Sequence, residues 1–253
     1  MNICIISPIE GLELYSTLSK THLVLAHIQD ERYVSFYKKR REAGDFLILD
    51  NGAHERGESV SWSTLEVALW IYRPQVCILP DVLNNHEKTL SQSLRFLDKN
   101  LSRYPHTEWM YVPQTKRGVK LLPEALDDSR IGSYITWIGI TRYLAIDHQQ
   151  SRISIANAIR LFWPKKKLHA LGMVKGDLLE LAQVRDSNLF ESLDTSVPIW
   201  RGWNNYLLKG DQPWPEIPVD FSAFGGDVNH KIILSNLEAI GVRKESEVEN
   251  SHL

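Results

Sequence analysis

The most constraining feature of the sequence is a regular alternation of short apolar runs with longer stretches of helical periodicity. In segments such as Ser61–Tyr72 and His86–Leu101, apolar residues return every three or four positions, which indicates amphipathic helices. Unbroken apolar stretches between such segments are typical of strands buried on both faces of a parallel sheet. Eight strand-like runs occur, at Asn2–Pro8, Leu23–Ile28, Phe46–Asn51, Val76–Val82, Trp109–Gln114, Tyr134–Ile140, Lys167–Met173 and Ser192–Pro198.

Eight strand-helix units in a chain of 253 residues fit a (β/α)8 barrel, which typically needs about 250 residues. We therefore predict an α/β fold, a single-domain (β/α)8 TIM barrel over residues 1–241, with an open doubly wound sheet as the alternative. Residues 201–226 hold three prolines and no clear period, which predicts a long loop over the barrel mouth after strand eight. A last helix is expected at about 228–240, followed by a polar tail at 242–253.

The composition limits the classes of protein to which this chain can belong. The 29 Lys and Arg against 31 Asp and Glu give a net charge of −2, so phosphate binding would need a local basic patch. Only two cysteines occur, Cys4 and Cys77, each inside an apolar run, which excludes a disulfide framework and favours plain core positions. No apolar stretch approaches the roughly 20 residues that a membrane span requires, so we expect a cytoplasmic protein.

Polar residues stand where the strand-like runs end. Asp50, Asp81, Gln114 and Asp194 close four of the runs, and the sixth ends near Gly139. In a (β/α)8 barrel the C-terminal ends of all strands meet at one mouth, where the chemistry of such enzymes takes place. Any one of these residues could simply cap the next turn, but burying several carboxylates together is costly unless they bind something.

The residue types suggest a glycosidic bond to a base as the target. Paired carboxylates suit displacement at a sugar carbon, one attacking while the other transfers protons. An Asp and a Gln in the same pocket could hydrogen-bond the edge of a heterocycle, because Asp accepts and Gln both donates and accepts.

At these residues the chain resembles the tRNA-guanine transglycosylase superfamily, especially its short phage-type, tRNA-ribosyltransferase-like members associated with 7-deazaguanine. The resemblance runs from about Phe46 to Pro198. Asp50-Asn51-Gly52-Ala53 looks like the family's Asp-Ser-Gly-Gly segment, and the Leu168–Met173 segment is similar to its LMGVG-like strand. Asp81, Gln114, Gly139 and Asp194 fall on its other motif positions.

The resemblance implies a glycosyltransferase (pentosyltransferase) that exchanges guanine in nucleic acid for a 7-deazaguanine base through a covalent aspartyl intermediate. Asp194 would be the nucleophile and Asp50 the acid and base. Its partners would be DNA or tRNA and the free base, with no cofactor and no membrane, in the cytoplasm or, if phage-encoded, the host cytoplasm. The implied substrate-binding residues are Asn51, Gly52, Asp81, Gln114, Gly139, Arg142 and Met173.

The chain departs from the family pattern at two points. The family's zinc site uses three cysteines and a histidine after strand eight, and no cysteine follows Cys77, so no metal is expected. The zinc region helps larger members dock tRNA, so DNA and tRNA both remain open. A hydrolytic N-glycosidase or nucleosidase and a non-catalytic nucleic-acid-binding relative are the alternative functions.

Basic and aromatic residues give weaker signals. Lys116, Arg117 and Arg142 follow strand ends and are candidates for phosphate contacts at the mouth. The basic run 38–41 predicts a solvated helix face. The aromatic residues Trp200, Trp203 and Tyr206 could stack on an unpaired base or pack within their own loop, and His54 is the one histidine expected near the mouth.

Overall fold

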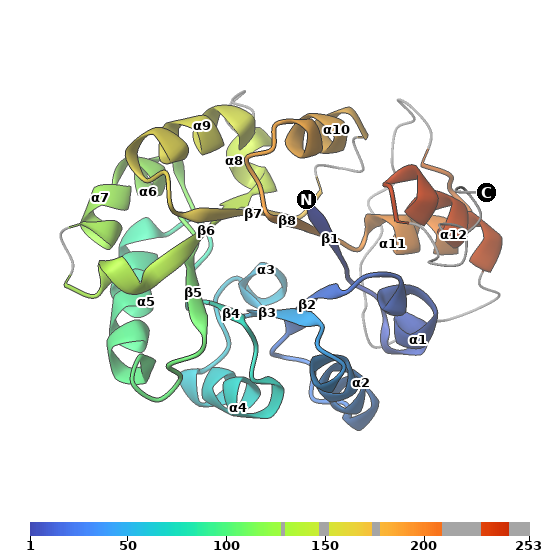
Figure 1. Ribbon diagram of the computed structural model, residues 1–253, viewed down its shortest axis with the longest axis horizontal. Helices are drawn as coiled ribbons and strands as arrows, with labels where there is room; N and C mark the ends of the chain where they lie inside the picture. The colour runs from blue at the N-terminus through green and yellow to red at the C-terminus, as the bar shows by residue number, and fades with distance from the viewer. Residues whose placement is uncertain (128–129, 147–151, 174–177, 209–228, 243–253) are drawn as a thin grey trace, which may run out of the picture.

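Eight parallel strands form one ring of sheet with most of the helices outside it (Figure 1). The computed structural model describes residues 1–127, 130–146, 152–173, 178–208 and 229–242. Each predicted run overlaps one strand. The strands are β1 (Asn2–Ile5), β2 (Thr21–Leu25), β3 (Phe46–Asp50), β4 (Val76–Ile78), β5 (Glu108–Tyr111), β6 (Ile135–Thr141), β7 (Lys167–Leu171) and β8 (Ser192–Thr195).

The order of the strands confirms the (β/α)8 barrel. From β2 to β8 each strand pairs with the next in sequence, and β1 pairs with β8, so the open doubly wound alternative is wrong. Strands β1 and β2 are neighbours, but no ladder of backbone hydrogen bonds joins these two described strands. Ser19 bridges this seam, because its hydroxyl lies 2.7 Å from the Ile3 carbonyl and 3.0 Å from that of Thr21.

Helices fill the steps between strands and cover the outside of the ring in Figure 1. Ser61 begins α4 as predicted, because its hydroxyl accepts the Thr64 N–H at 3.2 Å. The longer helices are α2 (Glu31–Glu42), α4 (Trp62–Tyr72), α5 (His86–Asn100), α9 (Arg152–Phe162), α10 (Leu178–Asp186) and α12 (His230–Ala239). The shorter ones are α1 (Leu12–Tyr15), α3 (Ala53–Arg56), α6 (Lys116–Lys120), α7 (Leu122–Leu126), α8 (Arg142–Ile146) and α11 (Val197–Trp203), with 3-10 helices η1 (Ile9–Gly11), η2 (Ser16–Leu18) and η3 (Gly132–Tyr134).

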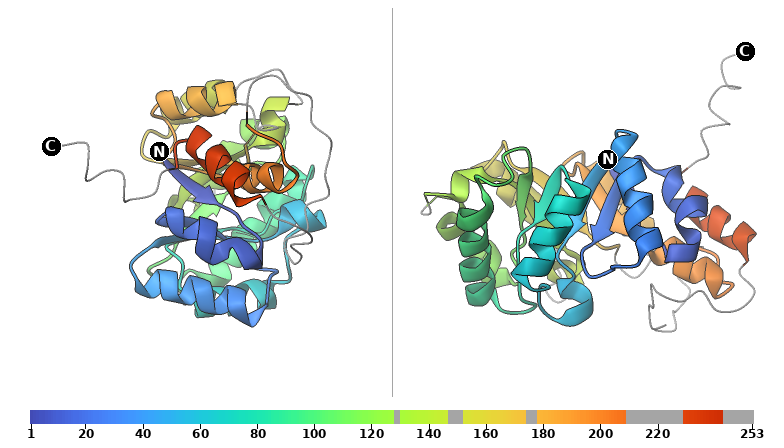
Figure 2. Two further views of the ribbon diagram at one scale, coloured as in Figure 1. Left: turned by 90° about the vertical axis from the view of Figure 1, so that its right-hand side faces the viewer. Right: turned by 90° about the horizontal axis from the view of Figure 1, so that it is seen from below.

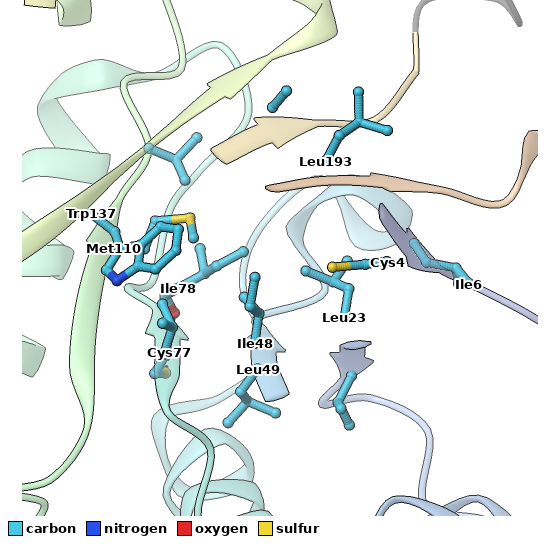
Figure 3. Packing of buried hydrophobic residues seen from close by; sticks show 14 of the residues in the cluster. Cys4, Ile6, Leu23, Ile48, Leu49, Cys77, Ile78, Met110, Trp137 and Leu193 are labelled. Carbon is cyan, nitrogen blue, oxygen red and sulfur yellow. Dashed lines mark hydrogen bonds between the residues drawn. The ribbon is translucent and has the colours of Figure 1, made fainter. Parts of the chain in front are cut away.

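Alternate residues of the strands fill the interior of the ring. Figure 3 shows Cys4, Leu23, Ile48 and Met110 pointing into the space that the strands enclose, whereas Leu49 points away from it. Cys4 and Cys77 are both fully buried and unpaired, which confirms them as core residues. A packed interior of this kind leaves the ends of the strands as the place for polar chemistry.

At the N-terminal end of the strands, a cluster of charged and aromatic side chains fills the barrel. Lys167 Nζ lies 2.9 Å from both carboxylate oxygens of Glu108, and Trp137 Nε1 donates to the same carboxylate at 2.6 Å. The ammonium also lies 5.3 Å from the centre of the Trp137 ring, and Phe46 packs against that ring. These side chains supply one another's charged and hydrogen-bonding partners, so we infer that this end of the barrel contributes to the stability of the fold.

The region after β8 differs from the predicted loop. Strand β8 ends at Thr195, and Val197–Trp203 form helix α11, so the loop prediction is wrong for residues 201–203. Thr195 Oγ1 accepts the Val197 N–H at 3.1 Å, and Pro198 stands in the first turn, a position that proline favours. Helix α11 packs on α12 at one side of the barrel (Figure 2), which confirms the last helix. Residues 209–226 of the predicted loop and 243–253 of the tail lie outside the described residues.

Arg152 fastens the turn after β7 to two outer helices. Its side chain has no solvent exposure and makes a two-pronged ion pair with Glu180 of α10, at 2.6 and 2.8 Å. The same guanidinium donates to the carbonyl of Gly172 at 2.6 Å and to that of Leu171 at 3.3 Å. The planar fork of arginine suits this set of acceptors.

We predict that Arg152→Leu lowers the free energy of unfolding by about 3–5 kcal/mol, because Glu180 and two carbonyls lose a buried cationic partner. Arg130→Leu is the control. Arg130 is exposed and pairs with Asp98 at 3.2 Å, and the loss of such a surface pair should cost about 0.5 kcal/mol. Urea unfolding of both variants measures the difference, and equal losses would contradict this role of Arg152.

Candidate active site at the barrel mouth

Asn51, Asp81 and Gln114 form one buried hydrogen-bonded network at the C-terminal ends of β3, β4 and β5. Asn51 Nδ2 donates to Asp81 Oδ1 at 2.9 Å and to the Leu79 carbonyl at 2.7 Å. Gln114 Nε2 donates to Asp81 Oδ2. Both oxygens of Asp81 therefore hold an amide donor, and three of the predicted site residues come together.

Burial shifts the acidity of Asp81. The side chain is almost fully buried, and this desolvation raises its pKa to about 6, although the hydrogen bonds from Asn51 and Gln114 oppose the rise. Both amide partners use an N–H on this carboxylate, and within the described residues the Gln114 carbonyl oxygen has no hydrogen bond, so it can accept one from another donor.

Asp194 on β8 is held by two donors on the same oxygen. Its Oδ1 lies 3.1 Å from His169 Nε2 and accepts the Gly172 N–H at 2.9 Å. His169 is fully buried, and its Nδ1 lies 2.7 Å from Ser192 Oγ. A carboxylate only accepts, so the network is consistent with Ser192 donating to Nδ1 and with Nε2–H donating to Asp194. Within the described residues Oδ2 carries no hydrogen bond, which leaves it for a reacting atom.

Asp50 is the last residue of β3, and its environment favours the protonated form. Its pKa is raised well above the ordinary value by burial and by the negative charges of Glu55, Asp81 and Asp194, and the hydrogen bond from Gly52 opposes this shift. Asp50 ends β3, Asp81 follows β4 and Asp194 lies next to the end of β8, so the parallel strands bring all three carboxylates to one mouth. An acid of raised pKa next to other carboxylates is the arrangement that enzymes use for proton transfer.

Two glycines with positive φ deliver backbone N–H groups to these carboxylates. Gly52 (φ 74°) donates to Asp50 Oδ2 at 2.8 Å, and Gly172 (φ 69°) donates to Asp194. A Cβ on Gly52 would lie 2.9 Å from His27 Nδ1, and one on Gly172 would lie 3.3 Å from the Arg142 side chain. Side-chain-bearing residues rarely adopt this conformation, so glycine is the residue that allows both turns.

A second polar group lies at the rim. Arg142, the first residue of α8, lies 3.3 Å from His54 Nε2 and donates to the Tyr143 hydroxyl at 3.3 Å. That hydroxyl lies 3.4 Å from His54 Nδ1, and the guanidinium stands 5.2 Å from the Tyr143 ring. The rim thus offers a cation and an aromatic ring next to the turn of Gly172.

Two predicted site residues lie beside these networks rather than in them. Gly139 lies within β6, where a Cβ would come within 2.8–3.1 Å of Leu171, Val112 and Met110. Met173 is buried and receives the Thr195 hydroxyl at 3.9 Å. Their contact with a base stays a prediction.

Sequence reasoning missed His169 and Ser192. The signal was present, because residues two apart on a strand share a face and Ser192 stands two before Asp194. His169 pairs with Ser192 in the register of β7 and β8, which the sequence does not reveal.

No family model matches this chain, and no curated protein matches it either. Within the described residues, no three His, Cys, Asp or Glu side chains gather as a metal site requires. No helix among them is long and apolar enough to cross a membrane.

We predict that stability depends on pH through Asp81. The pKa of Asp81 is about 6 in the folded protein against 3.8 ordinarily, so the folded state binds the proton more tightly than the unfolded state. Proton binding therefore adds to the free energy of unfolding at low pH, and this addition is lost as pH rises from about 4 to 6. The full effect is on the order of 3 kcal/mol. The stability of wild type relative to Asp81→Asn should therefore fall over this window, as measured by urea unfolding at each pH.

Asp186→Asn provides the control for this measurement, because Asp186 is largely exposed and pairs only with its neighbour Arg185 among the contacts described. Its difference from wild type should change little over the same window. A difference between wild type and Asp81→Asn that is independent of pH would contradict the raised pKa.

Proposed function

We propose that the protein is a nucleic-acid glycosyltransferase that exchanges guanine for a 7-deazaguanine base at the barrel mouth. The observation that carries the proposal is the contrast between two carboxylates. Asp194 has one oxygen held by two donors and the other without a partner in the described chain, whereas burial and neighbouring charges raise the pKa of Asp50. This contrast separates a nucleophile from an acid.

Asp194 performs the first displacement. Its Oδ2 attacks the anomeric carbon of the nucleotide, the bond from that carbon to the guanine nitrogen breaks, and the electron pair leaves with the base. The donors His169 Nε2 and Gly172 N fix the carboxylate, so that little reorganisation is needed as the ester forms.

Asp50 manages the proton. In its protonated form it donates to the departing guanine, which leaves neutral, and it then accepts the N–H proton of the incoming 7-deazaguanine. The deprotonated nitrogen of the new base attacks the same sugar carbon and releases Asp194. Atoms and charge balance over the two displacements, so neither water nor a cofactor enters.

The network of Asn51, Asp81 and Gln114 recognises the base. Guanine presents N–H donors beside a carbonyl acceptor, and a carboxylate can accept two more hydrogen bonds beyond those from Asn51 and Gln114. Gln114 has its carbonyl oxygen and a second amide hydrogen to offer. Arg142 at the rim supports a phosphate contact, and the nucleotide has to be unpaired to reach this depth. DNA and tRNA are the substrate classes, met in the cytoplasm.

We predict that the protein incorporates labelled 7-deazaguanine into a guanine-containing single-stranded oligonucleotide, and that Asp194→Ala abolishes incorporation. Asp50→Asn should slow it by about 100-fold or more, as expected for loss of a general acid and base. DNA and RNA oligonucleotides are tested in parallel, with label counted on the purified strand. Asp98→Asn, a surface change on α5, serves as the control.

The alternatives leave different products. If guanine is released and abasic sites remain without incorporation of the label, the protein hydrolyses the glycosidic bond instead of exchanging the base. Binding of the oligonucleotide with neither product would leave a non-catalytic binding protein. Incorporation by Asp194→Ala at the wild-type rate would remove Asp194 as the nucleophile.

We further predict that His169 acts as a positioning residue. His169→Leu removes a donor from Asp194 Oδ1 and should lower kcat by about tenfold with little change in KM for the base, since Asp81 and Gln114 are untouched. His169→Gln can restore a donor and should recover part of kcat. Single-turnover measurement of the covalent intermediate checks this, and an equal rise of KM in both variants would contradict it.

A further inference from the structure

A surface hollow of about 560 Å³ lies between α2 and α4, away from the mouth residues. It is lined by Lys38, Arg41, Glu42, Trp70, Ile71, Tyr72 and Arg73. Trp70 is 70% exposed, although large aromatic side chains are normally buried. Helices of a (β/α)8 barrel run back against the strands, so the C-terminal ends of α2 and α4 stand at the end opposite the mouth.

Positive charge surrounds the exposed indole. The hollow holds the cations Lys38, Arg41 and Arg73 against the single carboxylate of Glu42. A second hollow on α2 shares Lys38 and Glu42 and adds Lys39 and Glu31 to the charged residues. Because the two hollows share Lys38 and Glu42, we treat them as one track along α2, and its lining holds four cations and two carboxylates.

The internal contacts of these residues leave most of the charge available. Arg41 donates through Nε to the Arg73 carbonyl at 2.9 Å, which ties the ends of the two helices together. Arg40, the other cation of this run, is engaged inward with Asp45 at 2.6 Å. Lys38 and Arg73 are both exposed, so their charges face solvent beside Trp70.

We propose that this track binds single-stranded nucleic acid, with a base stacked on Trp70 and neighbouring phosphates on Lys38 and Arg73. Sequence-tolerant binding of single strands combines an exposed aromatic ring with a positive groove in this manner, and a base in a duplex cannot reach an indole. Because the track continues past one hollow, it fits a segment of several nucleotides rather than a free nucleotide.

The test uses full-length protein and fluorescence anisotropy with labelled dT12 and rU12. These probes contain no guanine, so the result does not depend on exchange at the mouth. Trp70→Ala should weaken binding about fivefold or more, the usual effect of removing one stacking platform. Lys38→Gln with Arg73→Gln should reduce the slope of log K against log salt by about 1.4, or about 0.7 for each phosphate contact. The tighter probe identifies DNA or RNA.

The matched control is Phe162→Ala with Lys165→Gln, an exposed aromatic residue and an exposed lysine at the C-terminal end of α9 and before β7. This variant should bind both probes as wild type does. Failure of wild type to bind either probe, unchanged binding by Trp70→Ala, or an equal loss in the control would overturn the proposal. A dimer in sedimentation that Trp70→Ala dissociates would assign the surface to self-association instead.

Discussion

Charge buried without a partner is so costly that the barrel mouth has to be organised around its three carboxylates. Each carboxylate has a different set of hydrogen-bond donors. Asp194 receives a histidine and a backbone N–H, and Asp81 receives two amide side chains. Asp50 receives one backbone N–H, and burial together with neighbouring negative charges raises its pKa. Asp50 takes its donor from the turn that follows its own strand, whereas the donors of Asp81 come from beyond β3 and β5 and those of Asp194 from β7 and the turn after it, so these two carboxylates are satisfied only when neighbouring strands are assembled. The different partners thus leave different oxygen atoms of three chemically similar side chains open to further contacts.

Periodicity and strand-end positions made the barrel predictable, because they depend on local rules. A strand buried on both faces has to be apolar for its whole length, and the parallel ring has to bring all of its C-terminal ends together, so Asp50, Asp81, Gln114 and Asp194 could be named from position alone. His169 could not be found in this way. Its role depends on the register of β7 against β8, which sets it beside Ser192, and register follows from packing of the whole sheet. The resemblance to transglycosylases named the carboxylates but said nothing of a histidine behind the nucleophile.

The end of β8 was misjudged for a similar reason. Ser192–Pro198 is continuous in its strand-like composition, and the strand stops where the Thr195 hydroxyl takes up the N–H of Val197. A side chain that hydrogen-bonds nearby backbone competes with the ladder, and the following proline then favours the first turn of a helix. The helix that results, α11, packs against α12, a contact between segments that no local pattern could link.

The site and the stability of the fold are coupled through Arg152. Its guanidinium holds the Gly172 carbonyl, while the N–H of the same residue holds Asp194, so one glycine joins a buried ion pair on the outer helices to the carboxylate at the mouth. Glycine has a wide choice of backbone conformations, and the hydrogen bonds made by the N–H and the carbonyl of Gly172 hold it at positive φ. If either hydrogen bond were lost, the Gly172 N–H could rotate away from Asp194. His169 would then be the one remaining donor of the two that Asp194 has in the described residues. Precision at the mouth therefore depends on a residue that contacts Gly172 but not Asp194 itself, which is how a barrel can vary its loops and still hold a carboxylate in place.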